Sequence, residues 1–349
     1  MQNQLLKKII ITKDTSLKNA IEILNDTAVQ ILLVVNQNQS LIGTLSDGDI
    51  RRAILKEYDL SKKVSSVMSS SPLFVYQNTP IPKIKSIMLK NSVRHIPLVD
   101  KNLKILDLFI SDNLINDNTQ KYLIVIMAGG KGLRLKPYTE DCPKPMLKIG
   151  SKPILEHIIE NAKSQGYKNF LISINYLGEI IKNYFKDGSE FGVNINYIEE
   201  KEFLGTVGGL SLIKPPLKDT FILMNGDLVA NINYDHFVDF HNQHKASFTI
   251  ALRYQELQNQ FGVVTLKGSE VEDFQEKPVI KNYINAGLYV LEPEVLKNLK
   301  FNKYCDIPDL IHKVKTIPLK IVGFPIVENW LDIGRHEDYE KVKLNFDRL

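Results

Sequence analysis

The stretch LIVIMAGGKGLRLKPYTEDCPKPMLKIG, residues 123–150, carries the strongest structural signal in this chain. Its first five residues are apolar and predict a buried β-strand, which a glycine-rich turn follows at once. Further apolar runs alternate with helical patterns downstream, as in NFLISINY (169–176) and FILMNGD (221–227). Strands that are apolar on both faces need helices over both faces. The sequence therefore predicts an α/β domain with a mostly parallel sheet.

The glycine-rich turn has the composition of a phosphate-binding loop. Glycine lacks a Cβ atom, so its backbone can approach a phosphate closely and point several N–H groups at it. Ligands of such a sheet bind beyond the carboxyl ends of the strands, which is where this turn lies. The glycines are Gly129, Gly130 and Gly132, and the neighbouring cations are Lys131 and Arg134. We therefore expect an anion here, with the Arg134 guanidinium holding two of its oxygens.

The composition indicates a folded protein with more than one domain. The chain has 349 residues, of which 44% are hydrophobic and 24% charged, and this length favours two domains. With 44 basic and 40 acidic residues the net charge is +4, which is too balanced to indicate a nucleic-acid or membrane surface. Cys142 and Cys305 are far apart in the chain, so no disulfide framework is expected. The N-terminus lacks an export-signal pattern, and we expect a cytoplasmic protein.

An internal repeat occupies the first 118 residues. Residues 28–50 align with residues 92–114 at an offset of 63 to 64 positions. Each copy combines a polar turn, an amphipathic helix (17–27 and 81–90) and two apolar strands around a polar hairpin. One copy alone would expose too much apolar surface, so the two are expected to share a core with a cleft between them.

A polar segment separates the repeat from the second domain. SDNLINDNTQK, residues 111–121, is rich in Asn and Asp, which is typical of a linker. We place the domain boundary near residue 120. The expected domains are 1–118, with copies at about 8–64 and 65–118, and 121–349.

The phrase GTLSDGDIRRAI (43–54) and the order of elements in the repeat resemble the tandem CBS module. The resemblance implies an adenine nucleotide as ligand, with Asp49 at the ribose hydroxyls and Ser46 near a phosphate. A second interpretation needs no ligand. Short polar side chains at a helix N-terminus accept hydrogen bonds from its free N–H groups, and Ser46 and Asp49 precede a predicted helix. The sequence leaves both interpretations open.

The second domain resembles the sugar-1-phosphate nucleotidyltransferases, also called nucleotide-sugar pyrophosphorylases. The likeness begins at GGKGLRLKPYTEDCPKPMLKIGSKPILEHII (129–159) and covers nearly all of residues 122–349. Further blocks in the family's order are EEKEFLGTVGGL (199–210), LMNGDLV (223–229), FGVV (261–264), EKP (276–278), INAGLYVLEPEVL (284–296) and WLDIGRHEDYEKV (330–342). The resemblance implies a Rossmann-like, mostly parallel sheet of the GT-A-like kind, flanked by helices and preceded by the CBS pair.

The resemblance also implies roles for individual residues. Arg134 would meet the departing pyrophosphate, and Lys144 of Pro-Lys-Pro would neutralise phosphate charge near the reacting atoms. Asp227 and Asp332 match the two carboxylates that hold Mg²⁺, while Lys277 matches the lysine that meets the sugar phosphate. The nucleotide-binding residues would be Ala128, Gly129, Gly130, Lys131, Gly132, Glu200, Gly205 and Thr206, and the sugar-binding residues Gly262, Glu276, Asn285 and Gly287.

Glu200 bears on the choice of base. Family members that use uridine or thymidine nucleotides commonly carry glutamine five positions before the glycine that corresponds to Gly205. An ionised carboxylate only accepts hydrogen bonds, and guanine N1–H and its 2-amino group are two adjacent donors. Glu200 therefore favours GTP. The alternatives are a thymidylyl- or cytidylyltransferase of the same fold, or a Glu200 that only faces solvent at a strand end.

The fused architecture bears on the sugar. A CBS pair before a compact guanylyltransferase-like domain resembles the enzymes that make GDP-glucosamine for bacterial legionaminic acid synthesis. Glucosamine 1-phosphate is thus the expected sugar, with mannose or heptose 1-phosphate as alternatives. A non-enzymatic alternative is a CBS-based nucleotide sensor with a degenerate second domain. Because CBS pairs frequently self-associate, a homodimer is one of the states that the resemblance allows.

Three histidines and one cysteine are given structural roles. His236, His241 and His244 are separated by five and three positions, which gives no common helical face for a metal ion. We expect them on a solvated helix surface. Cys142 lies near the glycine loop and is expected to pack rather than react.

Overall fold

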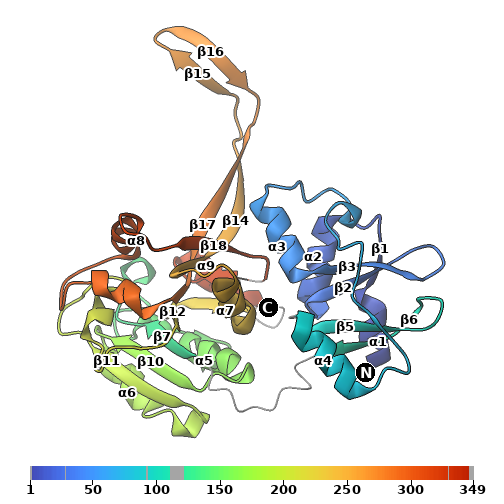
Figure 1. Ribbon diagram of the computed structural model, residues 1–349. Coiled ribbons are helices and arrows are strands. Elements are labelled where there is room, and N and C mark those ends of the chain that lie inside the picture. The colour runs from blue at the N-terminus through green and yellow to red at the C-terminus, as the bar shows by residue number, and fades with distance from the viewer. Residues whose placement is uncertain (1, 28, 92, 111–121, 329, 346–349) are drawn as a thin grey trace. The chain divides into compact units, whose positions relative to one another are not determined.

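The computed structural model describes residues 2–27, 29–91, 93–110, 122–328 and 330–345 (Figure 1). The side chains of residues 2–4, 89, 332, 344 and 345 lie outside this description. The chain divides into two compact units, Met1–Thr119 and Gln120–Leu349. The expected linker, 111–121, lies outside the described residues.

The first unit contains a structural duplication. Its elements are α1 (Gln2–Ile9), β1 (Ile10–Thr12), α2 (Leu17–Thr27), β2 (Ile31–Val35), β3 (Leu41–Ser46), α3 (Asp47–Leu55), β4 (Val75–Tyr76), α4 (Ile81–Asn91), β5 (His95–Val99) and β6 (Ile105–Ile110). They form two three-stranded sheets with the orders β1-β2-β3 and β4-β5-β6. In each sheet the first pair is parallel and the second antiparallel. The predicted repeat is confirmed.

The two copies agree down to the register of their hairpins. Ile31 pairs with Ser46 in the first copy, and His95 pairs with Ile110 in the second, each 64 positions later. The copies also contact each other, because Leu41 donates its N–H to the Leu103 carbonyl at 2.8 Å. The expected cleft between the copies stays a prediction.

Ser46 and Asp49 form a reciprocal cap at the N-terminus of α3. The Ser46 hydroxyl accepts the Asp49 N–H at 3.2 Å, and the Asp49 carboxylate accepts the Ser46 N–H at 2.8 Å. Arg52 also donates to Asp49, at 2.6 Å. The capping interpretation is therefore observed, while a nucleotide at these two residues stays a prediction.

The second unit is built on a seven-stranded sheet. Its helices are α5 (Ile154–Ser164), α6 (Gly178–Phe185), α7 (Tyr234–Gln243), α8 (Ile307–Lys315) and α9 (His336–Asn345), and its strands are β7 (Leu123–Met127), β8 (Lys148–Ile149), β9 (Lys152–Pro153), β10 (Asn169–Ile174), β11 (Asn194–Glu199), β12 (Phe221–Asn225), β13 (Leu228–Ala230), β14 (Phe248–Gln258), β15 (Val263–Lys267), β16 (Glu270–Gln275), β17 (Val279–Leu291), β18 (Ile321–Ile326) and β19 (Trp330–Asp332). The strand order of the main sheet is β11-β10-β7-β12-β17-β14-β18. Only β17 runs antiparallel to its neighbours, so the sheet is mixed and mostly parallel, as predicted.

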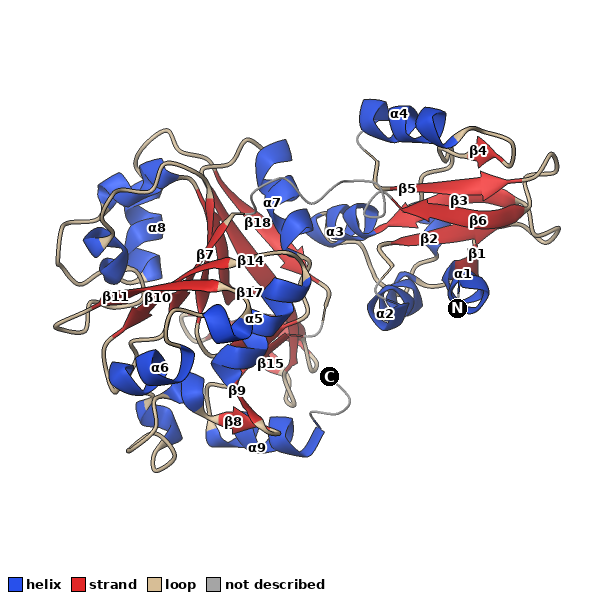
Figure 2. Cartoon of the chain, turned by 90° about the horizontal axis from the view of Figure 1, so that it is seen from below, coloured by secondary structure: helices blue, strands red, loops and turns tan. Residues whose placement is uncertain are grey.

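Helices cover both faces of this sheet (Figure 2). Ile124 and Ile126 point into a core with α5, α6, α7 and α9, while Val125 between them points into a second core with α8. This alternation is the two-residue period of a strand, so a continuous apolar run serves two cores at once.

Two strands extend beyond the sheet as an arm. β14 and β17 remain paired from Phe248 opposite Leu291 to Gln258 opposite Val279, and the β15–β16 hairpin continues from their ends (Figure 1). The pairing shifts register between Ile250 and Leu252, which marks a β-bulge at the base of the arm.

His241 does not lie on a solvated surface, so that expectation is wrong. The side chain is 1% exposed, and its two ring nitrogens lie 2.7 Å from Thr249 Oγ1 and 3.1 Å from Glu292 Oε1. Burial lowers the pKa of His241, although Glu292 opposes the shift. The helical spacing of the three histidines could not reveal this, because the partners come from other elements.

Within the described residues, no helix is both long and apolar enough to cross a membrane.

Replacing Ser46 tests the cap of α3. Ser46→Ala should weaken the first turn of the helix by about 1 kcal/mol, which raises amide exchange in residues 47–55 about fivefold. Hydrogen–deuterium exchange of the full chain measures this. The exposed Ser65→Ala is the matched control and should leave the exchange of that helix unchanged. Equal exchange in both variants would mean that the cap contributes nothing.

Candidate active site

Two adjacent parallel strands bring the glycine loop and Asp227 together. β7 and β12 are neighbours, with Met127 opposite Asn225 at their carboxyl ends. Just past this pair, Gly226 donates its N–H to the Met127 carbonyl at 2.9 Å. Glycine suits this position, because a Cβ atom on Gly226 would lie only 3.0 Å from that carbonyl oxygen. Asp227, the next residue, therefore lies beside the glycine loop that follows β7.

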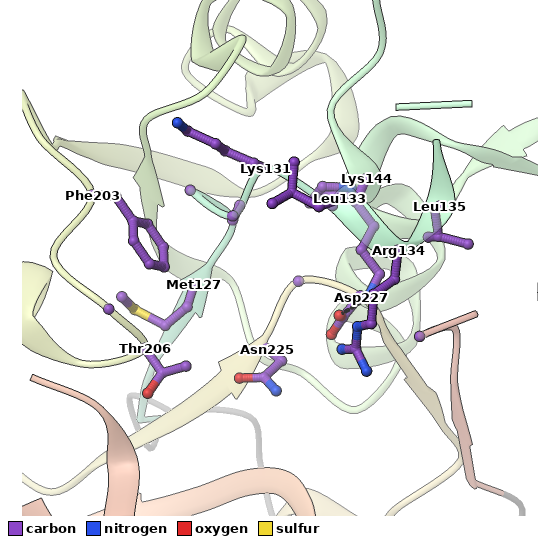
Figure 3. Close-up of a pocket in the computed structure, with 18 of the residues that line it drawn as sticks. Met127, Lys131, Leu133, Arg134, Leu135, Lys144, Phe203, Thr206, Asn225 and Asp227 are labelled. Atoms are coloured by element: carbon purple, nitrogen blue, oxygen red, sulfur yellow. Dashed lines mark hydrogen bonds and ion pairs between the residues drawn. The ribbon is translucent and has the colours of Figure 1, made fainter. Parts of the chain in front are cut away.

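A cavity of about 610 Å³ opens at this edge of the sheet. It is lined by Met127, Ala128, Gly129, Gly130, Lys131, Gly132, Leu133, Arg134, Leu135, Lys144, Pro145, Glu200, Phe203, Gly205, Thr206, Asn225, Gly226, Asp227 and Gly334. Arg134, Lys144 and Asp227 gather on one side of the cavity, and Lys131 and Phe203 lie on the other (Figure 3). All the residues expected to bind the nucleotide line this one space.

Gly132 holds the glycine loop in a conformation that other residues would not fit. Gly132 has φ +60°, and a Cβ atom there would lie 2.9 Å from Thr139 Cγ2. The buried Thr139 donates its hydroxyl to the Gly132 carbonyl at 2.9 Å, which fixes the turn. A Cβ atom on Gly130 would meet open space, so here the missing side chain leaves the backbone N–H groups open to the cavity.

Lys144 and Asp227 form an ion pair between two segments 83 positions apart. Their side chains are 12% and 22% exposed, so the pair lies in the wall of the cavity rather than on the free surface. The ammonium stands where positive charge can face both a carboxylate and an incoming phosphate. Lys144 is thus placed as expected, and its role toward phosphate stays a prediction.

The backbone of Asp332 lies close in space to the backbone of Asp227. It is opposite Leu228 in the β13–β19 pair, and the N–H of Ile333 lies 3.4 Å from the Asp227 carbonyl. The side chain of Asp332 lies outside the described residues. Sharing of one ion by the two carboxylates therefore stays a prediction.

The donor set fits Mg²⁺ that is bound together with a nucleotide. Mg²⁺ in proteins is usually held by one or two carboxylates plus substrate phosphates and water. The Asp227 carboxylate lines the cavity and forms an ion pair with Lys144. Positive charge is thus already bound next to this carboxylate. The described residues contain no cluster of three His, Cys, Asp or Glu side chains that could hold a metal alone. A metal here would depend on phosphate oxygens for its remaining ligands.

Glu200 is buried and lines the cavity, so the solvent-facing interpretation is wrong. The residue is 6% exposed and lines the cavity. Its carboxylate accepts the Ser173 hydroxyl at 2.6 Å and the N–H of Leu204 at 3.0 Å. A Cβ atom on Gly209 would lie 2.5 Å from Glu200 Oε1, so glycine is needed next to it. The carboxylate thus also fixes the loop that follows β11.

Asp306 positions the Gly205–Thr206 segment and was missed by the sequence analysis. Its Oδ1 accepts the N–H of Thr206 at 2.8 Å and the Thr206 hydroxyl at 3.1 Å. The backbone N–H of Ile307 donates in turn to Thr206 Oγ1 at 2.8 Å. The sequence pattern before α8 could have indicated a helix cap at Asp306, but not a partner one hundred positions earlier.

The residues expected to bind the sugar are not all brought together. A Cβ atom on Gly287 would lie 2.8 Å from the amide nitrogen of Asn225, which lines the cavity, and Asn285 accepts the Gly287 N–H at 3.1 Å. Gly262, Glu276 and Lys277 instead lie on the arm and are not among the residues that line the cavity. Their expected roles therefore stay predictions, because the cavity of the single chain is lined without these three residues.

The cavity has the chemistry of a polyphosphate site. Backbone N–H groups of the glycine loop, two lysines and one arginine supply positive potential, and Asp227 supplies a hard oxygen ligand for a cation. This arrangement can bind a nucleoside triphosphate at one end and place a second anion near its phosphates.

Two family profiles match the chain. The family described as "Nucleotidyl transferase" matches residues 123–348, and the CBS domain matches residues 5–56 and 64–115. The first match covers well over half of the chain, and the second covers both copies of the repeat. The predicted tandem CBS module is confirmed.

Several named proteins are similar to the second unit. A UTP–glucose-1-phosphate uridylyltransferase of Synechocystis sp. is 34% identical over 235 residues, which are 62% of this chain and 61% of that protein. A probable mannose-1-phosphate guanylyltransferase 1 of Oryza sativa subsp. japonica is 32% identical over 228 residues, 62% of each chain. A mannose-1-phosphate guanyltransferase of Yarrowia lipolytica is 33% identical over 228 residues, 62% and 61%. The chain thus spans about three fifths of the length of these relatives.

Solved structures share the fold of the second unit. HddC from Yersinia pseudotuberculosis is 26% identical with a TM-score of 0.50, covering 65% of this chain and all of that one, and has also been solved complexed with GMP-PN. A putative glucose-1-phosphate thymidylyltransferase from Bacillus anthracis has a TM-score of 0.52 at 22% identity, covering 64% and 94%, which concerns the fold alone. The predicted fold class is confirmed.

Removing the Asp306 carboxylate should loosen the Thr206 segment. Asp306→Ala removes the acceptor of two hydrogen bonds, and loss of a charged acceptor is worth about 1.5–3 kcal/mol, or at least about tenfold in amide exchange. Hydrogen–deuterium exchange of residues 204–208 measures the change. Asp309→Ala is the matched control, because it removes only the Asp309 side of the helix cap and should leave residues 204–208 protected. Unchanged exchange in Asp306→Ala would remove Asp306 from this role.

Proposed function

The chain belongs to the nucleotidyl transferase family, and from this premise we propose that it transfers a guanylyl group from GTP to a sugar 1-phosphate. The products would be a GDP-sugar and pyrophosphate. The observation that carries the proposal is the meeting of the glycine loop, Lys144 and Asp227 in one cavity.

The reaction needs electrostatic positioning more than acid–base chemistry. An oxygen of the sugar phosphate, already an anion, attacks the α-phosphorus of GTP. The bond from that phosphorus to the β-phosphate oxygen breaks, and pyrophosphate leaves with its electron pair. No proton has to be removed from the nucleophile. The obstacles are repulsion between two polyanions and the charge that gathers on the leaving group.

The chain's own cations address both obstacles. The N–H groups around Gly130 would hold the triphosphate, and Arg134 would hold the departing pyrophosphate through two parallel hydrogen bonds. Lys144 lies beside Asp227 at the centre of the cavity and would neutralise charge near the α-phosphate. Bound Mg²⁺, held by Asp227 and Asp332, would supply further neutralisation of phosphate oxygens.

The proposal of guanine rests on Glu200. The carboxylate lines the cavity and, with Ser173 and Leu204 as donors, retains lone pairs for further acceptance. Two adjacent N–H donors of guanine suit such an acceptor, whereas uracil and thymine present an acceptor on each side of one donor. Similar proteins named as guanylyltransferases and a structure complexed with GMP-PN support this choice, and a uridylyltransferase of similar identity supports the alternative base.

For the sugar, we propose glucosamine 1-phosphate, in the synthesis of a bacterial surface glycan such as legionaminic acid. The support is the fusion of a CBS pair to a guanylyltransferase-like unit. Mannose 1-phosphate is the acceptor named for several similar proteins and is the second candidate. For the CBS pair we propose an adenine nucleotide as ligand.

One assay tests the reaction and the roles of the charged residues. Pyrophosphate release is measured with each of GTP, CTP, UTP, dTTP and ATP against glucosamine, mannose and heptose 1-phosphates, with Mg²⁺. We expect the highest rate with GTP and glucosamine 1-phosphate. Asp227→Asn should lower kcat at least about a hundredfold, because the loss of one electrostatic stabiliser of this kind costs about 2.7–4 kcal/mol.

One control variant and two contrary outcomes interpret this assay. Asp239→Asn, on the partly exposed face of α7, should keep the wild-type rate. Silence of the wild type across the panel would favour the nucleotide-sensor alternative, and a near-normal rate in Asp227→Asn would remove Asp227 from the reaction.

Glu200→Gln tests the choice of base. The amide presents a donor as well as an acceptor, so kcat/KM for GTP should fall about tenfold or more relative to UTP and dTTP, as one lost or repelled base contact is worth about 1–3 kcal/mol. The exposed Glu202→Gln is the matched control and should leave the ratio unchanged. An unchanged ratio in Glu200→Gln, in a folded protein, would mean that Glu200 does not read the base.

A further inference from the structure

The arm carries chemistry that the cavity of its own chain lacks. Glu276 and Lys277, expected at the sugar and its phosphate, lie between β16 and β17 at the outer part of the arm. Asn285, also on β17, lies at the level of the sheet, opposite Leu252. Eight residues of extended chain separate Lys277 from Asn285, which is about 26 Å at 3.3 Å per residue. This inference rests on the proposed function.

The arm leaves the sheet at the edge where the cavity opens. β14 runs parallel to β12, since both are antiparallel to β17. The carboxyl end of β14, from which the arm extends, therefore lies at the same edge as Asp227. Figure 1 shows the arm rising as a narrow ribbon beyond β14, β17 and β18.

The base of the arm is rigidly attached. β18 flanks β14 up to the pair Arg253–Ile326, and Arg253 also donates to the Glu328 carbonyl at 3.0 Å. Beyond that point the β14–β17 ladder continues without a break to Gln258 opposite Val279. Folding back over its own cavity would require the ribbon to reverse direction within this ladder, and so to break its hydrogen bonds.

The hairpin at the tip has one apolar face and one mainly polar face, on which Val263 is the apolar exception. Val264 and Leu266 are two residues apart and share a face. Their partners Phe274 and Val271 lie opposite them, because a β-bulge between the two pairs takes up the odd spacing of residues 271 and 274. These four side chains are 45–65% exposed. Thr265, opposite Asp273, lies on the other face. Such alternation is typical of a sheet with one face packed on a core, and an isolated two-stranded hairpin is marginal in water.

The exposed apolar surface of the arm is a large part of what a stable interface buries. Ten large apolar side chains on the arm are 36–77% exposed: Leu257, Phe261, Val263, Val264, Leu266, Val271, Phe274, Val279, Ile280 and Tyr283. At about half exposure, each of the three aromatic side chains presents about 75–125 Å². Each of the seven aliphatic ones presents about 30–60 Å², at about 1.5–3 kcal/mol per buried side chain and 25 cal/mol per Å². The total is on the order of 600 Å² and is spread over both faces of the ribbon, because strand neighbours such as Val263 and Val264 point to opposite faces. A standard interface buries about 800 Å² per partner.

We propose that the partner is a second copy of this chain, and that each copy's arm closes over the other's cavity. Two copies that meet edge to edge place each arm at the opposite cavity, because arm and cavity share one edge. Leu133 and Phe203 line the cavity and are 65% and 44% exposed, which offers an apolar rim to the hairpin's apolar face. Glu276 and Lys277 then complete the sugar-phosphate site of the other copy, as in exchange of an element between protomers.

Complementation between two inactive variants tests the exchange. Asp227→Asn damages the cavity and Lys277→Ala damages the arm. The two chains are co-expressed with different tags, and the mixed dimer is isolated by two affinity steps. One of its two sites then combines an intact cavity with an intact arm. We expect about half of the wild-type rate of GTP-dependent pyrophosphate release from the mixed dimer, and at most about 1% from either variant alone.

The outcomes separate this inference from the proposed function. A mixed dimer as inactive as its parents, or a Lys277→Ala variant with wild-type activity, would overturn the exchange while an active wild type upholds the proposed function. A wild type that is inactive on every substrate would sink the proposed function, and the second measurement below then decides the inference by itself.

The second measurement needs no activity. A photo-crosslinking amino acid replaces Leu266 on the apolar face, with Thr265 on the polar face as the matched control position. The expected result is an interchain crosslink from position 266 to residues 129–134 or 203–206 of a second copy, mapped by mass spectrometry, and little from position 265. Absence of interchain crosslinks at position 266, or crosslinks that join only one chain to itself, would overturn the inference.

Discussion

Everything in the second unit depends on two parallel strands that end at the same edge of the sheet. β7 delivers the glycine loop and β12 delivers Asp227, and the hydrogen bond from Gly226 to the Met127 carbonyl holds the two exits together. A side chain at Gly226 would meet that carbonyl, so the junction tolerates little change. The buried apolar cores on both faces of the sheet fix the strands, and the strands fix the distance between loop and carboxylate.

The charged groups of the cavity are held by contacts within the chain. Lys144 faces Asp227, and Glu200 accepts hydrogen bonds from the Ser173 hydroxyl and the N–H of Leu204. Because these groups are already oriented, their dipoles and charges can stabilise phosphate charge without reorganisation. The Asp306–Thr206 contact extends the same principle to the far side of the cavity.

The sequence predicted those features whose cause is local. The apolar run at 123–127, the 64-residue repeat and the start of α3 at Ser46 follow from periodicity and capping, and the structure has each of them. Features that depend on distant partners were missed or mistaken. His241 is buried by Thr249 and Glu292, and Asp306 binds Thr206 across one hundred positions, neither of which a helical pattern encodes. The extended arm was also unforeseen, since alternation alone does not say whether an apolar face packs on its own chain.

In the proposed reaction, Asp227 and the glycine loop hold one cation and one triphosphate between them. The most direct test is a crystal structure of the wild type with a non-hydrolysable GTP analogue and Mn²⁺, whose anomalous signal locates the metal. We expect a Mn²⁺ peak within about 2.2 Å of an Asp227 oxygen, close to the metal–oxygen distance of Mg²⁺, and phosphates against residues 129–132. A nucleotide bound elsewhere, or a metal that does not touch Asp227, would contradict it.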